Sequence, residues 1–336
     1  MSSKPTLALA MGDPAGISPE LTAKALADPT VRDAADYIVF GDRRVLAMGE
    51  RHAGVSVDID VVGDLADRAS AATVFVDLGH LDPQTVPLGD VSLEGGRSAI
   101  TNFRNAIAFA KAGEVQAVTF TPFNKAAMRL AHPSYEDEVV FLNEELESDD
   151  EASEFNILPN LWNARVTSHV PISGVADLIK KDLILDKLEL THRSLKDAGI
   201  ANPRIAVAGL NPHAGDGGNF GREDMAEIEP AVAEGQARGI VCEGPFPSDT
   251  VFLRAKRGDF DAVLTMYHDQ GQIAMKLIGF DAGVTLLGGY PFPVCTPAHG
   301  TAYDIAGKGI ADLGATRNAL LLAARMANAQ ASSIAA

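Results

Sequence analysis

The sequence predicts an α/β fold with two lobes. Short apolar runs alternate along the chain with helix-compatible segments, and this alternation is typical of parallel βαβ units. At 336 residues the chain exceeds the usual size of one compact core, which favours two lobes. Polar and glycine-rich clusters follow several of the apolar runs, and open α/β sheets bind their ligands at the carboxyl ends of strands. We therefore expect a ligand site built from loops that follow strands.

The first predicted element is a strand from Thr6 to Ala10, and the sequence GDPAGISPE follows it. Ser18 can cap the next helix, with Pro19 at its first helical position. A strand, a glycine-bearing loop and a capped helix suit a loop that faces a ligand. They suit an ordinary tight turn equally well.

Later segments continue the alternation. Apolar runs predict strands at residues 37–40, 73–78, 116–120, 164–170, 204–210 and 261–266. Helical periodicity predicts helices at residues 97–115, 180–199, 223–237 and 315–326. The strand ends are therefore the places to look for functional side chains.

The strand at 116–120 leads into a polar junction with a helix. Thr121, Asn124 and Lys125 supply its polar groups, and Lys125 can face a substrate. Alternatively, Asn124 is only a helix cap and Lys125 a solvated residue of the first turn.

Three histidines, His169, His213 and His268, come at or just after predicted strand ends. A divalent cation takes imidazole readily, and an open metal position can hold a substrate hydroxyl and lower its pKa. Because the three residues are far apart in the chain, separate structural histidines are the alternative interpretation.

Three residues near these histidines are candidates for catalysis. Asp249 and Asp269 can be carboxylates that orient the imidazoles, or only a turn residue and a helix cap. Lys276 can act as a general acid or base if burial lowers its pKa. As the alternative, Lys276 is a surface lysine on the helix after the strand.

Residues 299–312, HGTAYDIAGKGIAD, combine small residues with His299 and Asp304. Small residues let the backbone approach a ligand closely, and Asp304 can accept hydrogen bonds from a ribose diol. The segment is not a GxGxxG fingerprint. No cluster of arginines lies beside Asp304, so NAD is expected rather than NADP.

The composition is that of a globular protein, with 46% hydrophobic and 22% charged residues. No apolar run is long enough to span a bilayer, and the first residues lack the apolar core of a signal peptide. The formal net charge of -17 argues against partners such as nucleic acid or membrane, which attract clustered Lys and Arg. An anionic small-molecule substrate stays open, because a local site can be basic. Only Cys242 and Cys295 occur, without a CxxC pair, so a cytoplasmic location is expected.

Five ordered motifs, MGDPAGISPE, LNPHAGDGGNFG, GPFPSDT, YHDQG and HGTAYDIAGKG, resemble those of 4-hydroxythreonine-4-phosphate dehydrogenases over nearly the full chain. The last motif is also similar to the HGSAPDIAGKG-type cofactor loop of isopropylmalate and isocitrate dehydrogenases. The resemblance implies a two-lobed α/β/α subunit of the isopropylmalate dehydrogenase-like type, with the active site in a cleft between the lobes. We expect residues 1–130 with 290–336 to form the first lobe, including the cofactor loop. Residues 131–289 would form the second lobe, with the metal-site histidines and the dimer contacts.

The resemblance also implies a homodimer that uses NAD and a divalent metal such as Zn, Mg, Mn or Co. His169, His213 and His268 would be the metal ligands, contributed from both subunits, and Lys276 would contact the substrate. The implied cofactor-binding residues are His299, Gly300, Thr301, Ala302, Asp304 and Asp312. The characteristic reaction oxidises a secondary alcohol beside a carboxylated carbon, and the resulting β-keto acid can lose carbon dioxide.

Four positions depart from the family pattern in the part that holds the substrate and its phosphate. Glu136 and Asp137 replace a His-Thr pair, and Thr285 and Val294 replace an Asn and an Arg. Loss of the arginine removes a bidentate phosphate partner, and two added carboxylates repel a dianion. We therefore predict an unphosphorylated hydroxy acid or cis-diol carboxylate, the class that terephthalate dihydrodiol dehydrogenases oxidise.

Three rival interpretations stay open. The chain can be a true pyridoxal-phosphate pathway dehydrogenase that holds the phosphate through Lys125 or Arg129. It can act on a phosphorylated four-carbon aldonate. A non-catalytic ligand-binding homologue is the third, although such a protein has no reason to retain the three histidines, Lys276 and Asp304.

Overall fold

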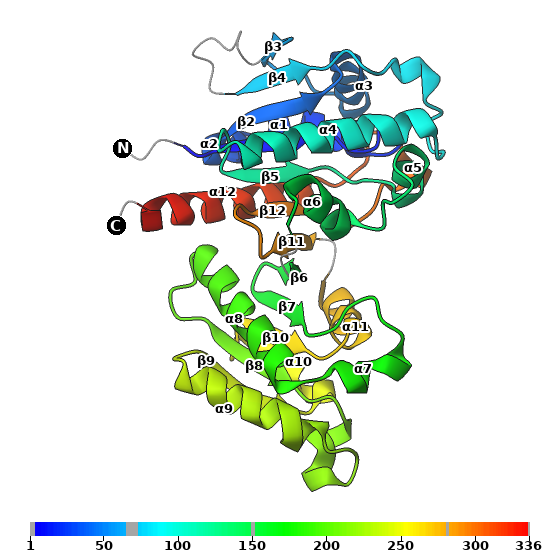
Figure 1. The fold of residues 1–336 in the computed structure, drawn as a ribbon. Coiled ribbons are helices and arrows are strands. Elements are labelled where there is room, and N and C mark those ends of the chain that lie inside the picture. Colours follow the sequence, from blue (N-terminus) through cyan, green and yellow to red (C-terminus); the bar gives the residue numbers. More distant parts are fainter. Residues whose placement is uncertain (1–3, 65–72, 149–151, 280–281, 335–336) are drawn as a thin grey trace. The chain divides into compact units, whose positions relative to one another are not determined.

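The computed structural model describes residues 4–64, 73–148, 152–279 and 282–334, and the chain divides into two compact units (Figure 1). Unit 1 comprises Met1–Glu151 and Tyr290–Ala336, and unit 2 comprises Ala152–Gly289. No helix among these residues is long and apolar enough to cross a membrane.

Unit 1 contains a parallel sheet whose strands run in the order β3-β4-β2-β1-β5-β12. The strands are β1 (Thr6–Ala10), β2 (Asp36–Gly41), β3 (Asp60–Val62), β4 (Val74–Asp77), β5 (Ala117–Phe120) and β12 (Val294–Pro297). The central strands β1 and β5 are buried along almost their whole length, which is why they read as continuous apolar runs in the sequence.

Helices cover this sheet, and Figure 1 shows α4 lying across one of its faces. The helices are α1 (Ser18–Ala27), α2 (Pro29–Ala34), α3 (Arg43–Ala53), α4 (Leu93–Lys111), α5 (Lys125–Ala131), α6 (Glu138–Leu146) and α12 (Gly314–Ile334). The helix predicted at 97–115 begins earlier, because the Ser92 side chain caps it at the Gly95 amide. Gly96 is needed inside α4, since a Cβ there would lie 1.9 Å from the carbonyl oxygen of Ala127.

The boundary predicted between the lobes at residues 130 and 131 is wrong, because residues 131–151 belong to unit 1. In this segment Phe141 of α6 is fully buried and stacks on Phe103 of α4, with the ring centroids 5.5 Å apart. Burial of such a ring stabilises the contact by about 2 kcal/mol. Arg104 also pairs with Glu145 at 2.8 Å, so α6 is held on α4 by both apolar and polar contacts.

The prediction that Ser18 caps α1 is also wrong. The N-cap position is Ile17, and Ser18 is the first residue of the helix. The Ser18 hydroxyl instead donates to the carbonyl oxygen of Pro122 at 2.6 Å, which ties the GDPAG loop to the loop after β5.

Unit 2 contains a mixed sheet in the order β11-β6-β7-β10-β8-β9. The strands are β6 (Ser153–Leu158), β7 (Leu161–Arg165), β8 (Arg204–Ala208), β9 (Val241–Phe246), β10 (Ala262–Thr265) and β11 (Val284–Gly288). β7, β10, β8 and β9 are parallel, whereas β6 is antiparallel to both β7 and β11. The carboxyl ends of β7, β10 and β8 therefore meet at one edge of the sheet.

The helices of unit 2 are α7 (Ile172–Leu178), α8 (Lys181–Asp197), α9 (Glu229–Ala237), α10 (Ser248–Lys256) and α11 (His268–Gly279). A π-helical turn, Asp224–Ile228, precedes α9. The strand predicted at 164–170 is β7, which starts three residues earlier and ends at Arg165. His169 consequently lies in the loop after β7.

Candidate functional site

His169 and His268 lie close together at the carboxyl edge of the unit 2 sheet. β7 and β10 are neighbours with Thr265 opposite Arg165, and the pairing continues where the Thr167 amide donates to the carbonyl oxygen of Met266. His169 follows β7 and His268 begins α11 directly after β10. The centroids of the two imidazole rings are consequently 5.8 Å apart, with 41° between the ring planes.

Asp269 contacts the His268 ring. Its Oδ1 lies 2.7 Å from Nδ1 of His268, and both side chains are accessible to solvent. A carboxylate on one ring nitrogen fixes the orientation of the imidazole and leaves the other nitrogen for a ligand. This is the contact expected of an orienting carboxylate.

His213 lies in the same unit on an unusual loop after β8. The backbone has consecutive positive φ values at residues 213–218, including 55° at His213 and 44° at Asp216. Such angles cost roughly 1 kcal/mol or more for each residue other than glycine, and they concentrate at functional sites. The buried Asp224 carboxylate offsets part of this cost, because it accepts from the amides of Leu210 and Asn211.

The His213 ring packs beside Phe220, with centroids 6.0 Å apart. Within the described ranges, no three His, Cys, Asp or Glu side chains gather in an arrangement that could hold a metal ion. A single chain therefore brings His169 and His268 together, and it does not place His213 beside this pair. Two neighbouring imidazoles, one oriented by a carboxylate, fit part of the donor set of a divalent cation and require a further donor from elsewhere.

The other two catalytic candidates are on helices of unit 2. Asp249 lies in the first turn of α10, is exposed, and makes no hydrogen bond to an imidazole in the part of the chain that the structure describes. Lys276 is exposed on α11, two turns beyond His268. Gln270 ties this region together, because its Nε2 donates to the carbonyl oxygen of Gly209 and to Ser248 Oγ, both at 2.8 Å.

The predicted cofactor segment belongs to unit 1, and the GDPAG loop supports it. The Ile17 amide donates to the Thr301 carbonyl oxygen, and the Ala311 amide donates to the Glu20 carboxylate. A Cβ at Gly16 would lie 2.6 Å from the Thr301 carbonyl oxygen, so glycine is required there. The glycines of GDPAG therefore allow close packing of two loops of the protein.

Within the cofactor segment, several residues keep their side chains or backbone accessible. Asp304 and Gly300 are exposed, and His299 and Ala302 are partly exposed. Thr301 is 8% exposed. Asp312 accepts from the Gly314 amide at 2.5 Å and so helps to start α12. Asp304 therefore presents its carboxylate to solvent.

Tyr303 links this segment to the GDPAG loop through a buried carboxylate that the sequence analysis did not single out. Its hydroxyl donates to Oδ2 of Asp13 at 2.5 Å, while the Ala15 amide donates to Oδ1 at 2.8 Å. Asp13 is 1% exposed, and burial raises its pKa while the two hydrogen bonds oppose that rise. Burial and the neighbouring Asp13 raise the pKa of Tyr303.

Replacing Tyr303 by phenylalanine should lower the free energy of unfolding by about 2 kcal/mol at neutral pH, because a buried carboxylate loses a donor. The folded chain binds the Asp13 proton more tightly than the unfolded chain, so this group contributes stability below its unfolded-state pKa and loses it as pH rises through the folded-state pKa. Removing the hydroxyl raises that folded pKa further. The difference in the free energy of unfolding between the variant and the parent should therefore become smaller at acidic pH. Urea unfolding at several pH values measures it, with Tyr267→Phe as the control.

Several of the predicted substrate residues of unit 1 are engaged in contacts with other groups of the protein. Lys125 Nζ lies 3.4 Å from the Glu138 carboxylate. Arg129 donates to the carbonyl oxygens of Tyr135 and Glu136 at 3.1 and 3.2 Å. Asp137 caps α6 by accepting from the Val140 amide, as Asn124 caps α5. The Glu136 side chain is exposed.

The two remaining substrate candidates lie on strands. Thr285 is half-buried on β11 of unit 2, directly opposite Asn156 of β6. Val294 is fully buried on β12 of unit 1, so its isopropyl group forms part of a core rather than of an open surface.

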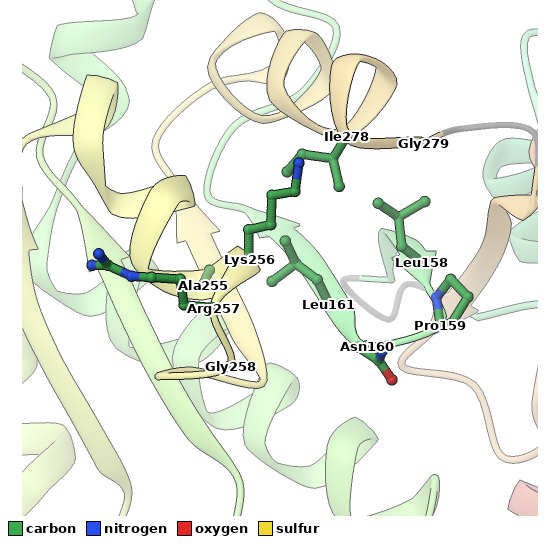
Figure 2. Close-up of a pocket in the computed structure, with 10 residues that line it drawn as sticks. All are labelled: Leu158, Pro159, Asn160, Leu161, Ala255, Lys256, Arg257, Gly258, Ile278 and Gly279. Carbon is green, nitrogen blue, oxygen red and sulfur yellow. The ribbon is translucent and has the colours of Figure 1, made fainter.

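A pocket of about 430 Å³ lies elsewhere in unit 2, and Figure 2 shows the residues that line it. Leu161 begins β7 and Gly258 precedes β10, so the pocket is at the amino ends of these parallel strands. His169 and His268 follow the carboxyl ends of the same two strands. In Figure 2 the Arg257 guanidinium points away from the other lining side chains, which leaves Lys256 as the cationic side chain directed towards them. The pocket is therefore separate from the histidine pair.

Residues 33–323 match the family described as pyridoxal phosphate biosynthetic protein PdxA. A Rhizobium meliloti protein that carries the name of a candidate 4-hydroxythreonine-4-phosphate dehydrogenase 2 is 60% identical over 326 residues, which cover 96% of this chain and 94% of that protein. The D-threonate 4-phosphate dehydrogenase of Cupriavidus necator is 38% identical, covering 97% of this chain and 98% of that protein.

Solved structures agree with these matches. The 4-hydroxythreonine-4-phosphate dehydrogenase of Klebsiella pneumoniae is 34% identical, with a TM-score of 0.80 over 97% of this chain and 99% of that chain. The terephthalate 1,2-cis-dihydrodiol dehydrogenase of Burkholderia xenovorans is 27% identical, with a TM-score of 0.68 over 96% and 98% of the two chains. A β-decarboxylating dehydrogenase of Thermococcus kodakarensis, 15% identical with a TM-score of 0.52 over 97% and 83% of the two chains, shares the α/β fold. The chain therefore belongs to the PdxA family and is an oxidoreductase of the 4-hydroxythreonine-4-phosphate dehydrogenase type.

Proposed function

We propose that this protein is an NAD-linked, divalent-metal-dependent dehydrogenase that oxidises a secondary alcohol next to a carboxylated carbon. The observation that carries the proposal is the pair of imidazoles of His169 and His268, 5.8 Å apart at the carboxyl edge of the unit 2 sheet. Among the metals considered, imidazole suits Zn better than Mg or Mn, which prefer oxygen ligands. His213, on its strained loop, is the proposed third ligand, supplied by a second copy of the chain.

When bound, a divalent cation would supply Lewis-acid polarisation of the substrate hydroxyl, and NAD would supply the hydride acceptor. Asp269 holds the His268 ring in one orientation through its contact with Nδ1. Lys276 would take the hydroxyl proton as the alcohol becomes a ketone, and, where carbon dioxide is then lost, would return a proton to the carbon of the resulting enolate. Asp304 would accept hydrogen bonds from the ribose diol of NAD. Loss of carbon dioxide from the β-keto acid can follow, and released bicarbonate would report it.

The proposed substrate is an unphosphorylated hydroxy acid or cis-diol carboxylate. The carboxylates of Glu136, Asp137 and Glu138 lie in succession, and the two nearby cations, Lys125 and Arg129, already pair with Glu138 and with backbone carbonyls. A phosphate dianion at this place would meet repulsion and would have to displace these contacts. The 27% identical terephthalate dihydrodiol dehydrogenase supports a substrate of this class.

The second candidate activity is oxidation of D-threonate 4-phosphate, which the name of the Cupriavidus necator relative favours. In that case the Lys125 ammonium would give up its ion pair with Glu138 and bind the phosphate instead. Both candidates use the same histidines, and they differ in whether the substrate carries a phosphate.

Matched substrate pairs test the proposal. Purified protein with Zn, Co, Mn or Mg is offered D-threonate and its 4-phosphate, 4-hydroxythreonine and its 4-phosphate, and an aromatic cis-diol carboxylate, with NAD or NADP. We expect NADH formation with an unphosphorylated compound and loss of activity with a chelator. A kcat/KM at least tenfold higher for either phosphorylated compound would overturn the substrate assignment. Absence of turnover and of NAD binding would favour a ligand-binding homologue.

We further propose that a second copy of the chain docks on unit 2 beside the histidine pair. Large apolar side chains are exposed there: Ile172 follows His169 and is 70% exposed, and Ile273 and Leu277 of α11 are 61% and 82% exposed. Ile273 and Leu277 lie one turn apart on α11, and contiguous exposed apolar patches mark protein interfaces. Such an interface would let each copy add its third ligand to its partner's pair.

Replacing Leu277 by glutamate should raise the dimer dissociation constant by at least about 30-fold, because an unpaired charge in an interface costs about 2 kcal/mol or more. Sedimentation velocity over a concentration series measures the change. Leu130→Glu is the matched control, since Leu130 is 55% exposed on α5 of unit 1. A monomeric parent protein, or equal behaviour of the two variants, would contradict the proposed interface.

A further inference from the structure

Arg165 is a buried arginine beside the histidine pair, and neither the sequence motifs nor the proposed reaction uses it. It ends β7 and is 4% exposed. Its Nη1 donates to Oδ1 of Asn156 at 2.9 Å, and its Nε donates to Ser168 Oγ at 3.1 Å. Its Nη2 lies 2.7 Å from the Glu154 carboxylate. The guanidinium therefore contacts three different side chains at once.

These contacts connect the two segments that carry the histidines. On one side, Ser168 immediately precedes His169. On the other side, Asn156 Oδ1 accepts a second hydrogen bond, at 2.7 Å, from Nε2 of Gln272. Gln272 lies one turn beyond His268 on α11. A chain of hydrogen bonds thus runs from the His169 loop through Arg165 and Asn156 to α11.

Stability alone is a poor explanation of this network. A buried guanidinium loses its hydration, and replacing a buried ion pair by apolar side chains is often neutral or stabilising. Gln272, 8% exposed, leaves its Oε1 without a hydrogen-bond partner in the described structure, which costs roughly 1 to 3 kcal/mol. What the planar guanidinium adds is geometry, because its Nη1 and Nε donors point in fixed directions towards two separate acceptors, Asn156 and Ser168.

We propose that Arg165, through Ser168 and through Asn156 and Gln272, is a positioning residue that sets the spacing of the His169 and His268 imidazoles for a divalent cation. The inference rests on the proposed function. It assigns to this network the role of outer groups around a metal site, whose removal typically costs 10- to 100-fold in metal affinity.

The test measures Co²⁺ binding to the full-length protein by calorimetry and by the visible absorption of the bound ion. Ser168→Ala and Gln272→Met each remove one arm of the network without leaving a buried charge unpaired. Arg165→Lys keeps the positive charge and loses the planar fork. We expect each variant to bind Co²⁺ about tenfold more weakly or worse, with a changed absorption spectrum.

Matched controls come from the same unit. Ser173 is an exposed serine of α7, and Gln236 donates to the Cys242 carbonyl oxygen away from the histidines. Ser173→Ala and Gln236→Met should bind Co²⁺ within about twofold of the parent protein. Near-ultraviolet circular dichroism identifies any variant that fails to fold. If Arg165→Lys fails to fold, the other two variants decide.

The outcomes separate this inference from the proposed function. If the parent binds Co²⁺ and Ser168→Ala and Gln272→Met bind it as tightly as the controls, the positioning role is overturned and the metal site stands. If the parent binds no Co²⁺, the metal site and the positioning role fall together. Weaker binding by the network variants, with the controls unchanged, supports the inference.

Discussion

Replacing His268 by glutamine is expected to lower kcat/KM by about a thousandfold with the best substrate of the panel. The expected loss corresponds to about 4 kcal/mol of transition-state stabilisation, the several kcal/mol that a Lewis acid contributes. Glutamine preserves much of the side chain's size but is a weak ligand for a divalent cation. The ring also lies beside His169 and contacts Asp269, so its loss removes half of the histidine pair. Steady-state kinetics at saturating metal measure the loss of kcat/KM, and Co²⁺ titration measures the loss of metal affinity.

The control for this prediction is His192→Gln. His192 is a partly exposed histidine of α8 in the same unit, and burial lowers its pKa. Its replacement should leave both kcat/KM and Co²⁺ affinity within about threefold of the parent. Full activity of His268→Gln would show that the histidine pair is structural, which is the alternative that the sequence left open.

Replacing Lys276 by alanine is expected to lower kcat by 10²- to 10⁴-fold, the range that a general acid or base contributes. Co²⁺ affinity should stay within about threefold of the parent, because the amine is not proposed to be a metal ligand. The pH profile of kcat should lose one limb, and a positioning defect would not produce that change. Lys276 follows His268 by two turns on α11, so the amine and the imidazole rise from the same helix.

Lys256→Ala provides the comparison, because Lys256 is an exposed lysine at the end of α10 beside the pocket of Figure 2. Its removal should leave kcat unchanged within about twofold. If Lys276→Ala and Lys256→Ala have the same kcat, Lys276 is a surface lysine without a role in catalysis, which is the alternative interpretation of its exposed position.

Local pattern predicted some elements to the residue and missed others for identifiable reasons. β1 spans Thr6–Ala10 as expected, since a short apolar run bounded by polar residues is buried on both faces. β9 escaped prediction because it contains Gly244 and Pro245, which normally interrupt strands, and it pairs only at the sheet edge. β11 was missed because glycines and prolines surround it and its partner β6 is distant in sequence.

Some residues of the candidate site could likewise be predicted from the sequence, and others could not. The family motifs contain His213 and His268, since a motif is a local property of the chain. His169 lies outside these motifs and was predicted from its place at a strand end and from the family resemblance. Arg165 carried no such signal, because an isolated arginine at the end of an apolar run reads as the polar boundary of a strand. Only its burial against Asn156 and Ser168 distinguishes it from a surface arginine.

By itself the sequence determined the family, the α/β alternation and the three candidate histidines, His169, His213 and His268. The tertiary structure alone decided that His169 and His268 are adjacent within one chain while His213 packs against Phe220. The physical reason is strand order. β7 and β10 are separated by about a hundred residues, and side-chain periodicity records which face of a strand is buried but not which strand lies beside it.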